Sequence, residues 1–183
     1  MASILSHPVV ALGLQPWFRH NSFPPRIWSL GGACTILPDA DVIAFHFGIP
    51  YGAMFGHRGF THSLFFATLL STLLVGLSSR FEVQRSSRLA LFVYFFLCTT
   101  SHGVFDAMTN GGLGVAFFAP FLSERYFFPW RPIRVSPISA SRFLSARGLA
   151  ILQSELLWIW GPILVLGLVG YLLHLAFMKH ERV

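Results

Sequence analysis

Long apolar stretches alternate with short polar ones along this chain, and the pattern predicts a series of hydrophobic helices. A helix needs roughly 20 apolar residues to cross a bilayer, so the length of each stretch separates full spans from partial ones. Ser3–Phe18 is short for a span, whereas Phe60–Leu77 is the first convincing one. The expected segments are Ser3–Phe18, Ile27–Leu37, Phe60–Leu77, Leu89–Met108 and Leu149–Met178.

Proline and glycine interrupt this pattern at defined places. The second segment ends at Pro38, and an irregular stretch follows it, so we expect a broken or re-entrant element there. Asn110–Gly114 predicts a turn, and Pro162 predicts a kink in the last helix. Between them, Val115–Leu122 is a short apolar piece expected at the membrane interface, and Glu124–Arg147 is expected to be a long loop.

Composition turns this pattern into a prediction of an integral membrane protein. Of the 183 residues, 54% are hydrophobic and only 11% are charged, against about 25% charged residues in soluble domains. We therefore expect an all-α membrane bundle with about four hydrophobic helices, forming a single domain over residues 1–183. The first residues lack a basic region and a small-residue cleavage site, so we expect no cleaved signal peptide. The expected location is a bacterial or archaeal cytoplasmic (inner) membrane.

The net charge of +6 comes almost entirely from arginine. In a membrane protein, such charges set the topology and contact anionic headgroups, and the planar fork of arginine also suits phosphate. Nucleic-acid binding is not expected, because the arginines are dispersed among apolar segments. The basic residues divide almost evenly between the two ends of the predicted bundle. The short loops give a slight preference for a site that faces away from the cytoplasm.

Scarce carboxylates and imidazoles gather in three short motifs. The chain has 7 acidic residues, and three of them fall in these motifs together with three histidines. The motifs are Leu37-Pro38-Asp39-Ala40-Asp41, His57-Arg58-Gly59-Phe60-Thr61-His62 and Ser101-His102-Gly103-Val104-Phe105-Asp106.

Folding the predicted hairpin brings these motifs together. With a rise of about 1.5 Å per residue, His62 lies roughly 27 Å from Arg80, and His102 lies roughly 21 Å from Arg88. Both histidines therefore lie at the end of the hairpin that is far from its loop, Ser78–Arg88. Asp106 is one turn beyond His102 on the same helix face. The motif that ends at Asp41 precedes the hairpin, so it is expected at the same end.

Each motif taken alone also has a purely structural interpretation. His57 and His62 could be an interfacial pair that is bonded to backbone groups. Asp39 or Asp41 could cap a helix N-terminus. A histidine and an aspartate in an apolar segment could form one hydrogen-bonded pair, although ionisable groups at membrane depth usually mark a functional site.

Taken together, three histidines and three aspartates at one membrane face predict a divalent metal site. Nitrogen and oxygen ligands of this kind suit zinc, and more than four of them suit two or three ions. A metal activates water and polarises a phosphoryl or acyl oxygen, so the expected reaction is hydrolysis. His7, beside Pro8, is either structural or a candidate ligand by its expected location, and Glu155 either interacts with the dipole of the last helix or acts as a ligand or base. The expected ligands are His7, Asp39, Asp41, His57, His62, His102, Asp106 and Glu155, and the expected catalytic side chains are Asp41, Asp106, Glu155 and Arg58.

These motifs resemble those of the LexA-binding, inner-membrane-associated metal-dependent hydrolases. The resemblance rests on His7 in an N-terminal apolar segment and on the three motifs, and it extends to Ser154 and Glu155 at the start of the last helix. That family is related to the zinc-dependent phospholipase C and single-strand nuclease group, which are all-helical enzymes that cleave phosphate esters. The resemblance implies the same set of metal ligands and supports hydrolysis more strongly than any particular substrate.

The function predicted from the sequence is that of a membrane-bound zinc phosphoesterase. Its expected partners are membrane lipid and a phosphate-containing substrate, most plausibly a lipid, with Arg58 or a loop arginine holding the phosphate. One alternative is a protein that moves metal ions or protons, but its groups should then follow a continuous path across the membrane. Another is a non-catalytic scaffold with a structural metal, which would have no open coordination position.

Overall fold

The computed structural model describes residues 1–19, 23–77, 83, 87–137 and 143–180. The expected connecting loop, Ser78–Arg88, lies almost entirely outside these residues. The elements in chain order are α1 (Val9–Phe18), α2 (Pro25–Ile36), η2 (Leu37–Phe47), η3 (Phe60–His62), α3 (Leu64–Gly76), α4 (Arg88–Ala107), α6 (Ala146–Glu155), η6 (Leu156–Trp160) and α7 (Gly161–His180).

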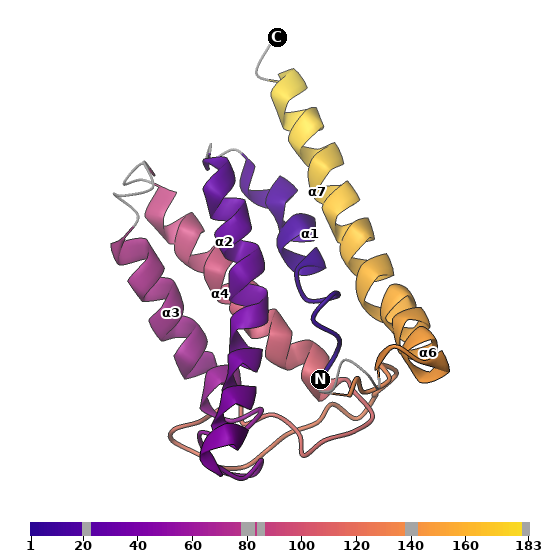
Figure 1. Ribbon diagram of the computed structural model, residues 1–183. Coiled ribbons are helices and arrows are strands. Elements are labelled where there is room, and N and C mark those ends of the chain that lie inside the picture. Colours follow the sequence, from indigo (N-terminus) through magenta and orange to yellow (C-terminus); the bar gives the residue numbers. More distant parts are fainter. Residues whose placement is uncertain (20–22, 78–82, 84–86, 138–142, 181–183) are drawn as a thin grey trace.

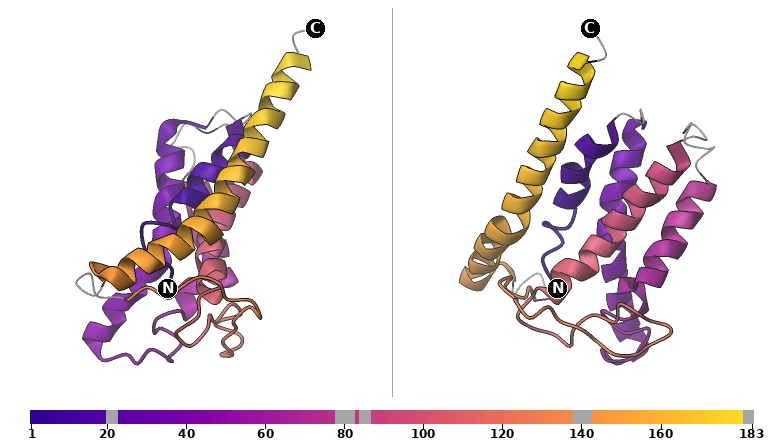
Figure 2. Two further views of the ribbon diagram at one scale, coloured as in Figure 1. Left: turned by 90° about the vertical axis from the view of Figure 1, so that its right-hand side faces the viewer. Right: turned by 180° about the vertical axis from the view of Figure 1, so that it is seen from behind.

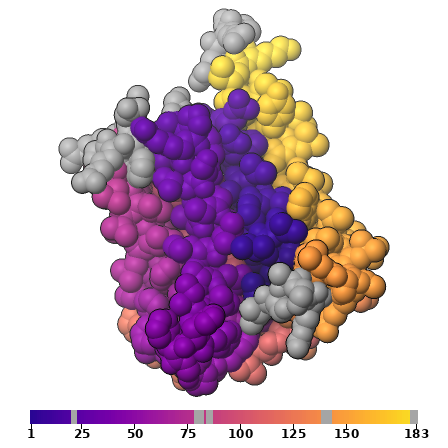
Figure 3. All heavy atoms as spheres, in the orientation of Figure 1, coloured from indigo at the N-terminus to yellow at the C-terminus, as the bar shows by residue number. Residues whose placement is uncertain are grey.

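The helices pack side by side, and the non-helical segments gather at one end of the bundle (Figures 1 and 2). The pairs in contact include α1 with α7, α1 with α2, α2 with α4, and α3 with α4. Figure 3 shows α3, α2, α1 and α7 across one face, with η2 at its lower end. The described part of the chain contains isolated β-bridges but no strand, which confirms the all-α prediction.

Two helices among the described residues are long and apolar enough to cross a membrane. They are α4 and the continuous helical run Ala146–Lys179. The shorter apolar helices α1 and α3 have 10 and 13 residues, and together with the two long helices they agree with the expected bundle of about four hydrophobic helices. The segment expected from Ser3 becomes helical only at Val9, after Pro8.

The predicted start of the third segment at Phe60 is also wrong. Ser63 has extended backbone angles (φ −81°, ψ 155°), and its hydroxyl accepts a hydrogen bond from the Phe66 amide at 3.0 Å. It therefore caps α3 at Leu64, and Phe60–His62 forms a separate 3-10 turn. The apolar pattern ran through this cap, but the separate turn allows His62 to point in a direction different from that of α3.

The break predicted at Pro38 is a change of helix type. The α-helical hydrogen bonding of α2 gives way to a 3-10 segment of 11 residues, η2, which contains Asp39 and Asp41. Runs of 3-10 helix longer than three or four residues are uncommon, and they often mark strained or functional sequence. The segment ends at Gly48, whose positive φ of 72° suits glycine.

The kink expected at Pro162 is present as a change of direction between α6 and α7 (Figure 2). A π-helical turn, η6, precedes the proline, and the Gly161 amide donates to the Leu156 carbonyl. The wider turn accommodates a proline ring that an α-helix would bring against the carbonyl four residues earlier.

Glycine allows α1 to approach α7 closely. A Cβ atom added at Gly13 would lie 2.7 Å from the Ile163 carbonyl oxygen and would also overlap the Ile163 side chain. Small residues at contacts between membrane helices act in this way because they let the backbones approach. By contrast, a Cβ at Gly32 on α2 would meet nothing within 4 Å.

We predict that Gly13→Ala destabilises the protein by about 1–3 kcal/mol, because the added methyl group overpacks this contact. Gly32→Ala is the matched control, since it should be neutral or stabilise by roughly 0.5–1 kcal/mol through lower chain entropy. Thermal unfolding of the detergent-solubilised variants measures both effects. Equal melting temperatures for the two variants would contradict this description of the α1–α7 contact.

Candidate metal centre

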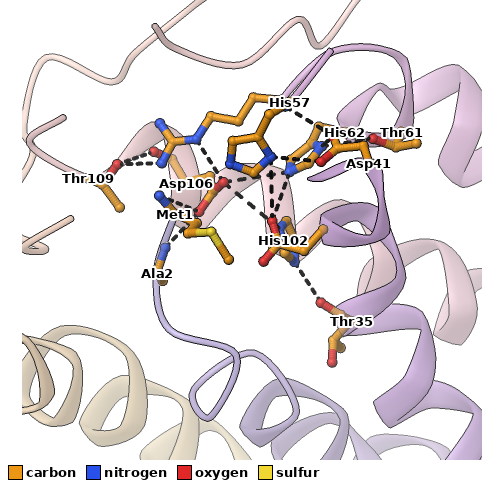
Figure 4. A network of polar contacts seen from close by, with 12 residues as sticks. Met1, Ala2, Thr35, Asp41, His57, Thr61, His62, His102, Asp106 and Thr109 are labelled. Carbon is orange, nitrogen blue, oxygen red and sulfur yellow. Dashed lines mark hydrogen bonds and ion pairs between the residues drawn. The ribbon is translucent and has the colours of Figure 1, made fainter. Parts of the chain in front are cut away.

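Four buried donor groups from three elements face one another at the non-helical end of the bundle. They are Asp39 on η2, His62 on η3, and His102 and Asp106 on α4. One ligand atom from each lies within 4.8 Å of all the others. Figure 4 shows His62, His102 and Asp106 turned toward a common region. The hairpin prediction, that the three motifs meet at one end of the bundle, is confirmed.

The distances between these atoms fit a single cation. His102 Nε2 lies 3.2 Å from Asp39 Oδ1 and 3.9 Å from Asp106 Oδ2. His62 Nε2 lies 3.7 Å and 3.6 Å from the same two oxygens. A tetrahedron with metal–ligand bonds of about 2.0 Å has edges of about 3.3 Å. The four atoms therefore have the spacing that two nitrogen and two oxygen ligands of zinc would require, with a slight contraction.

The hydrogen bonds behind the two imidazoles point their free nitrogens at this region. His102 Nδ1 lies 2.7 Å from the Thr35 carbonyl oxygen, which can only accept, so Nδ1 carries the proton. In the neutral ring, Nε2 is then a lone-pair donor that faces two carboxylates. Among the described residues, His102 Nε2, His62 Nε2 and both Asp39 oxygens have no hydrogen-bond partner, and Asp106 Oδ2 has an ion pair with Arg58 but no hydrogen bond. Buried polar atoms rarely lack partners, and here all five atoms border one small volume.

A second group, formed by Asp41, His57 and His62, lies beside the first and shares His62. Asp41 Oδ1 lies 2.7 Å from His57 Nδ1, and its Oδ2 accepts hydrogen bonds from the Thr61 hydroxyl at 2.7 Å and the Arg58 amide at 3.1 Å. His62 Nδ1 is 3.2 Å from the same Oδ2. This carboxylate is thus well supplied with partners, and it orients two imidazoles as carboxylates behind metal-bound histidines do.

The charge balance of the cluster depends on His62. Burial lowers the pKa of its imidazole, but the nearby carboxylates of Asp106, Asp39 and Asp41 outweigh burial and raise this pKa to about 10. For Asp41, burial raises the pKa, but the His57 and His62 side chains outweigh it and hold the pKa at about 2. Without another cation, His62 therefore carries a proton at neutral pH. A metal ion and this proton would compete for the same nitrogen.

Arg58 lies inside the cluster instead of at its surface. Its side chain is fully buried, and its Nε lies 2.9 Å from Asp106 Oδ2. Its other nitrogens donate to the Gly111 carbonyl and the Thr109 hydroxyl, each at 3.0 Å. The backbone has a positive φ of 61°, which is strained for a residue with a long side chain. These contacts hold Asp106 in place, and the expected contact of Arg58 with substrate stays a prediction.

His7 lies against the cluster but outside both donor groups. Its ring stacks on His102 with centroids 3.8 Å apart and an angle of 15° between the planes. Burial and the neighbouring His102 lower the His7 pKa to about 3, so the ring is neutral. Neither of its nitrogens has a hydrogen-bond partner in the described part of the chain. A neutral, fully buried imidazole without partners fits a further ligand, and this expected role of His7 stays a prediction.

Glu155 is buried near His7, but it lies outside the two donor groups. Its carboxylate accepts hydrogen bonds from the Ser3 amide, the Ser3 hydroxyl and the Ser6 hydroxyl, the last at 2.7 Å. Asp106 Oδ1 similarly accepts from the Ala2 amide at 2.8 Å. In this structure, Glu155 fixes the N-terminal segment that carries His7, and its expected role as a ligand or base stays a prediction.

Several groups that support the cluster gave no sequence signal. The Thr35 carbonyl and the Ala2 amide are backbone groups, which composition cannot reveal. Arg125, in the predicted loop Glu124–Arg147, donates to the carbonyls of His57, Tyr51 and Ala53 at 3.0–3.1 Å. It therefore holds the loop that carries the first histidine motif. Thr109, three residues after Asp106, could have been recognised as a partner on the same turn.

An apolar cavity of about 480 Å³ borders the cluster at Asp39. Its walls come from the N-terminal segment, η2 and the residues that precede α6. Asp39 therefore belongs both to the donor group and to this wall, although both of its carboxylate oxygens are buried.

Comparison with known proteins shows which family this chain is similar to. The chain matches the YdjM inner membrane protein family over residues 1–182. The chain is 37% identical over 172 residues to inner membrane protein YbcI of Escherichia coli (strain K12). The aligned region covers 93% of this chain and 98% of that protein. No solved structure matches the chain. These matches support the resemblance inferred from the motifs as far as an inner-membrane family, and LexA binding and hydrolysis stay predictions.

We predict that Glu155→Ala loosens the N-terminal segment without changing the bundle. Hydrogen bonds to a charged group contribute about 1.5–3 kcal/mol each, so losing even one should raise the local opening equilibrium about tenfold or more. Hydrogen exchange of the peptide containing residues 2–7 measures this effect. Glu124→Ala, at an exposed loop position, is the control. Unchanged exchange in Glu155→Ala would contradict this anchoring role.

Proposed function

The chain belongs to the YdjM inner membrane protein family, and from its buried His–Asp cluster we propose that it is a membrane-bound, metal-dependent phosphoesterase. The observation that carries the proposal is the set of nitrogen and oxygen atoms without a hydrogen-bond partner on Asp39, His62 and His102, which lie beside the Asp106 oxygen that is ion-paired with Arg58. Their spacing and chemistry suit zinc or a comparable divalent ion. The motif resemblance to the LexA-binding, inner-membrane-associated hydrolases, a family related to zinc-dependent phospholipase C, supports the same chemistry.

The donor arrangement also bears on the number of ions. Asp39, His62, His102 and Asp106 form one complete set of four donors. Asp41 and His57 would contribute to a second ion only by giving up the 2.7 Å hydrogen bond that joins them. We therefore propose one ion held by the first set, with Asp41 orienting His57 and His62 from behind. A second ion remains the alternative that the sequence raised.

The proposed reaction is the hydrolysis of a phosphate ester. The oxygen of a water molecule forms a new bond to phosphorus, the ester P–O bond breaks, and one proton passes to the leaving oxygen to give an alcohol. A divalent cation would make water more acidic and offset the charge that develops on phosphoryl oxygens. The protein must supply an access route, a fixed geometry and a place for the proton.

Asp39 is the best-placed carboxylate for handling that proton. Of the four donors, it alone lines the apolar cavity, and its Oδ2 has no hydrogen-bond partner among the described residues. Asp106 is held more rigidly, because the Ala2 amide donates a hydrogen bond to one carboxylate oxygen and the Arg58 guanidinium forms an ion pair with the other. We therefore propose Asp39 as the proton acceptor, in place of Asp41 and Glu155, which the sequence suggested. Both of those carboxylates have several hydrogen-bond donors around them.

Two other functions compete with this proposal. A structural metal in a non-catalytic scaffold would use the same four ligands, whereas hydrolysis requires a further coordination position that water can occupy. An ion-conducting protein would place ionisable groups along the bundle, whereas the four described donor atoms lie within 4.8 Å of one another. Confinement of the donors to one place therefore argues against conduction, and the hydrolysis assay separates the enzyme from the scaffold.

We predict that the purified protein holds roughly one or more divalent ions per chain and that His102→Ala and Asp106→Ala each lower the metal affinity at least a hundredfold. Each change removes a ligand and leaves its partners unbalanced. His46→Ala is the matched control, because this histidine is exposed on η2 and lies outside both donor groups. Elemental analysis and a competition titration measure the effect. Equal metal content in all four proteins would refute the metal centre.

We also predict metal-dependent hydrolysis of phosphate esters by protein reconstituted in lipid nanodiscs. Removal of the metal by a chelator should abolish activity, and addition of zinc should restore it. Asp39→Asn and His102→Ala should lower the turnover rate at least a hundredfold. His46→Ala should keep the wild-type rate. Metal binding without hydrolysis of any ester in a broad screen would favour the structural-metal scaffold.

A further inference from the structure

A second pocket lies at the end of the bundle opposite the donor cluster, where the C-terminal parts of α1 and α7 face each other (Figure 1). Its volume is about 360 Å³, which is within the range of pockets that bind small ligands. The lining residues are Arg19, Tyr171, His174, Leu175, Met178 and Lys179. The ten residues of α1, about 15 Å of helix, separate this pocket from the segment that carries His7, so it is distinct from the metal centre.

Two helices form the pocket. The residues from α7 follow one stripe along its surface, at the spacing of i, i+3, i+4, i+7 and i+8. Arg19, which directly follows α1, faces this stripe, and its guanidinium carbon lies 6.0 Å from the centroid of the Tyr171 ring. A ligand bound in the pocket would therefore contact both helices at once.

The polar groups in the pocket suit an anion. Arg19 and Lys179 are cationic, and His174 can donate from a ring nitrogen. No aspartate or glutamate lines the pocket among the described residues. Two like charges that share one concave surface repel each other, and an anion between them replaces this repulsion with attraction. The planar fork of arginine matches the oxygens of a phosphate in particular.

The side chains around the pocket place it at the membrane interface. The Trp17 indole donates to the Leu166 carbonyl at 3.0 Å, and Trp17 and Tyr171 are both partly exposed. Tryptophan and tyrosine are enriched where acyl chains meet headgroups. Leu175 and Met178 are also exposed and add an apolar wall beside the cationic groups. A phospholipid offers a phosphate and hydrocarbon side by side, whereas a soluble phosphate ester would leave this wall uncovered.

We propose that this pocket binds the phosphate group of an anionic phospholipid, which joins α1 to α7 at the end of the bundle away from the donor cluster. The lipid is a bound ligand that stays intact, so the site is independent of the metal centre and of hydrolysis. An anionic lipid fits better than a zwitterionic one, because the cation of a choline headgroup would be repelled by Arg19 and Lys179. Since α1 follows the segment that carries His7, the bound lipid also fixes the helix that leads to the cluster.

Native mass spectrometry of the full chain in detergent, titrated with phosphatidylglycerol, tests the site. Arg19→Gln and Lys179→Gln should each weaken binding of the first lipid roughly fivefold, because each removes one cation from the phosphate. Arg147→Gln is the matched control and should bind the lipid as the wild type does, since Arg147 is exposed on α6 and does not line the pocket. An equal loss of affinity in all three variants would overturn the pocket in favour of a general attraction between lipid and a basic protein.

Two competitors identify the kind of ligand. Phosphatidylcholine should bind about tenfold more weakly than phosphatidylglycerol, because its headgroup has no net charge. Glycerol 3-phosphate, which has no acyl chains, should not displace phosphatidylglycerol at equal concentration. Equal affinity for the two lipids, or displacement by glycerol 3-phosphate, would overturn the assignment to an anionic phospholipid.

Thermal unfolding in nanodiscs tests whether the lipid joins the two helices. Phosphatidylglycerol added to phosphatidylcholine discs should raise the Tm of the wild type and of Arg147→Gln by about 2–4 °C, since the lipid binds only the folded protein. The Tm of Arg19→Gln should rise by less than half as much. A rise of the same size in Arg19→Gln and in the wild type would overturn the bridge between α1 and α7.

Discussion

The fold of the protein depends on carboxylate oxygens and imidazole nitrogens that face one another out of contact with water. Asp39 Oδ1 and Asp106 Oδ2 both lie within 4 Å of the Nε2 atoms of His62 and His102. Charges at such separations interact by several kcal/mol when water does not screen them, and burial of an unpaired carboxylate is costly in itself. A positive charge among these atoms is therefore a condition for the fold. A proton on His62 and the Arg58 guanidinium meet part of this requirement, and a divalent ion would meet more of it.

The rest of the structure can be understood as the means of holding these atoms together. The 3-10 segment after α2 delivers Asp39 and Asp41, and the cap at Ser63 lets His62 leave the direction of α3. Arg58 adopts a positive φ and joins Asp106 to the loop at Thr109 and Gly111. Irregular backbone is concentrated at this end of the bundle, where several short segments must place side chains to within a fraction of an ångström.

The sequence predicted the main features of the site because they follow from helix geometry. The rise per residue placed His62 and His102 at the same end of a hairpin, and the i,i+4 spacing placed Asp106 beside His102. It did not predict the start of α3, because a serine cap inside an apolar run leaves the hydrophobic pattern unchanged. Nor could it predict that Ser3 and Ser6 donate hydrogen bonds to the Glu155 carboxylate, since these contacts depend on tertiary packing. The cavity arises from three distant segments and leaves no periodic signal.

The contacts of Glu155 have a consequence for the biogenesis of the protein. Ser3 and Glu155 are separated by 152 positions, so the N-terminal segment cannot reach its final place until the start of the last helix has been synthesised. His7 follows this segment directly and stacks on His102 from a helix made in between. The chain must therefore be inserted almost completely before the wall of the cluster closes. Until then the N-terminal segment does not cover the donor atoms, and completion of the chain is the step that encloses them.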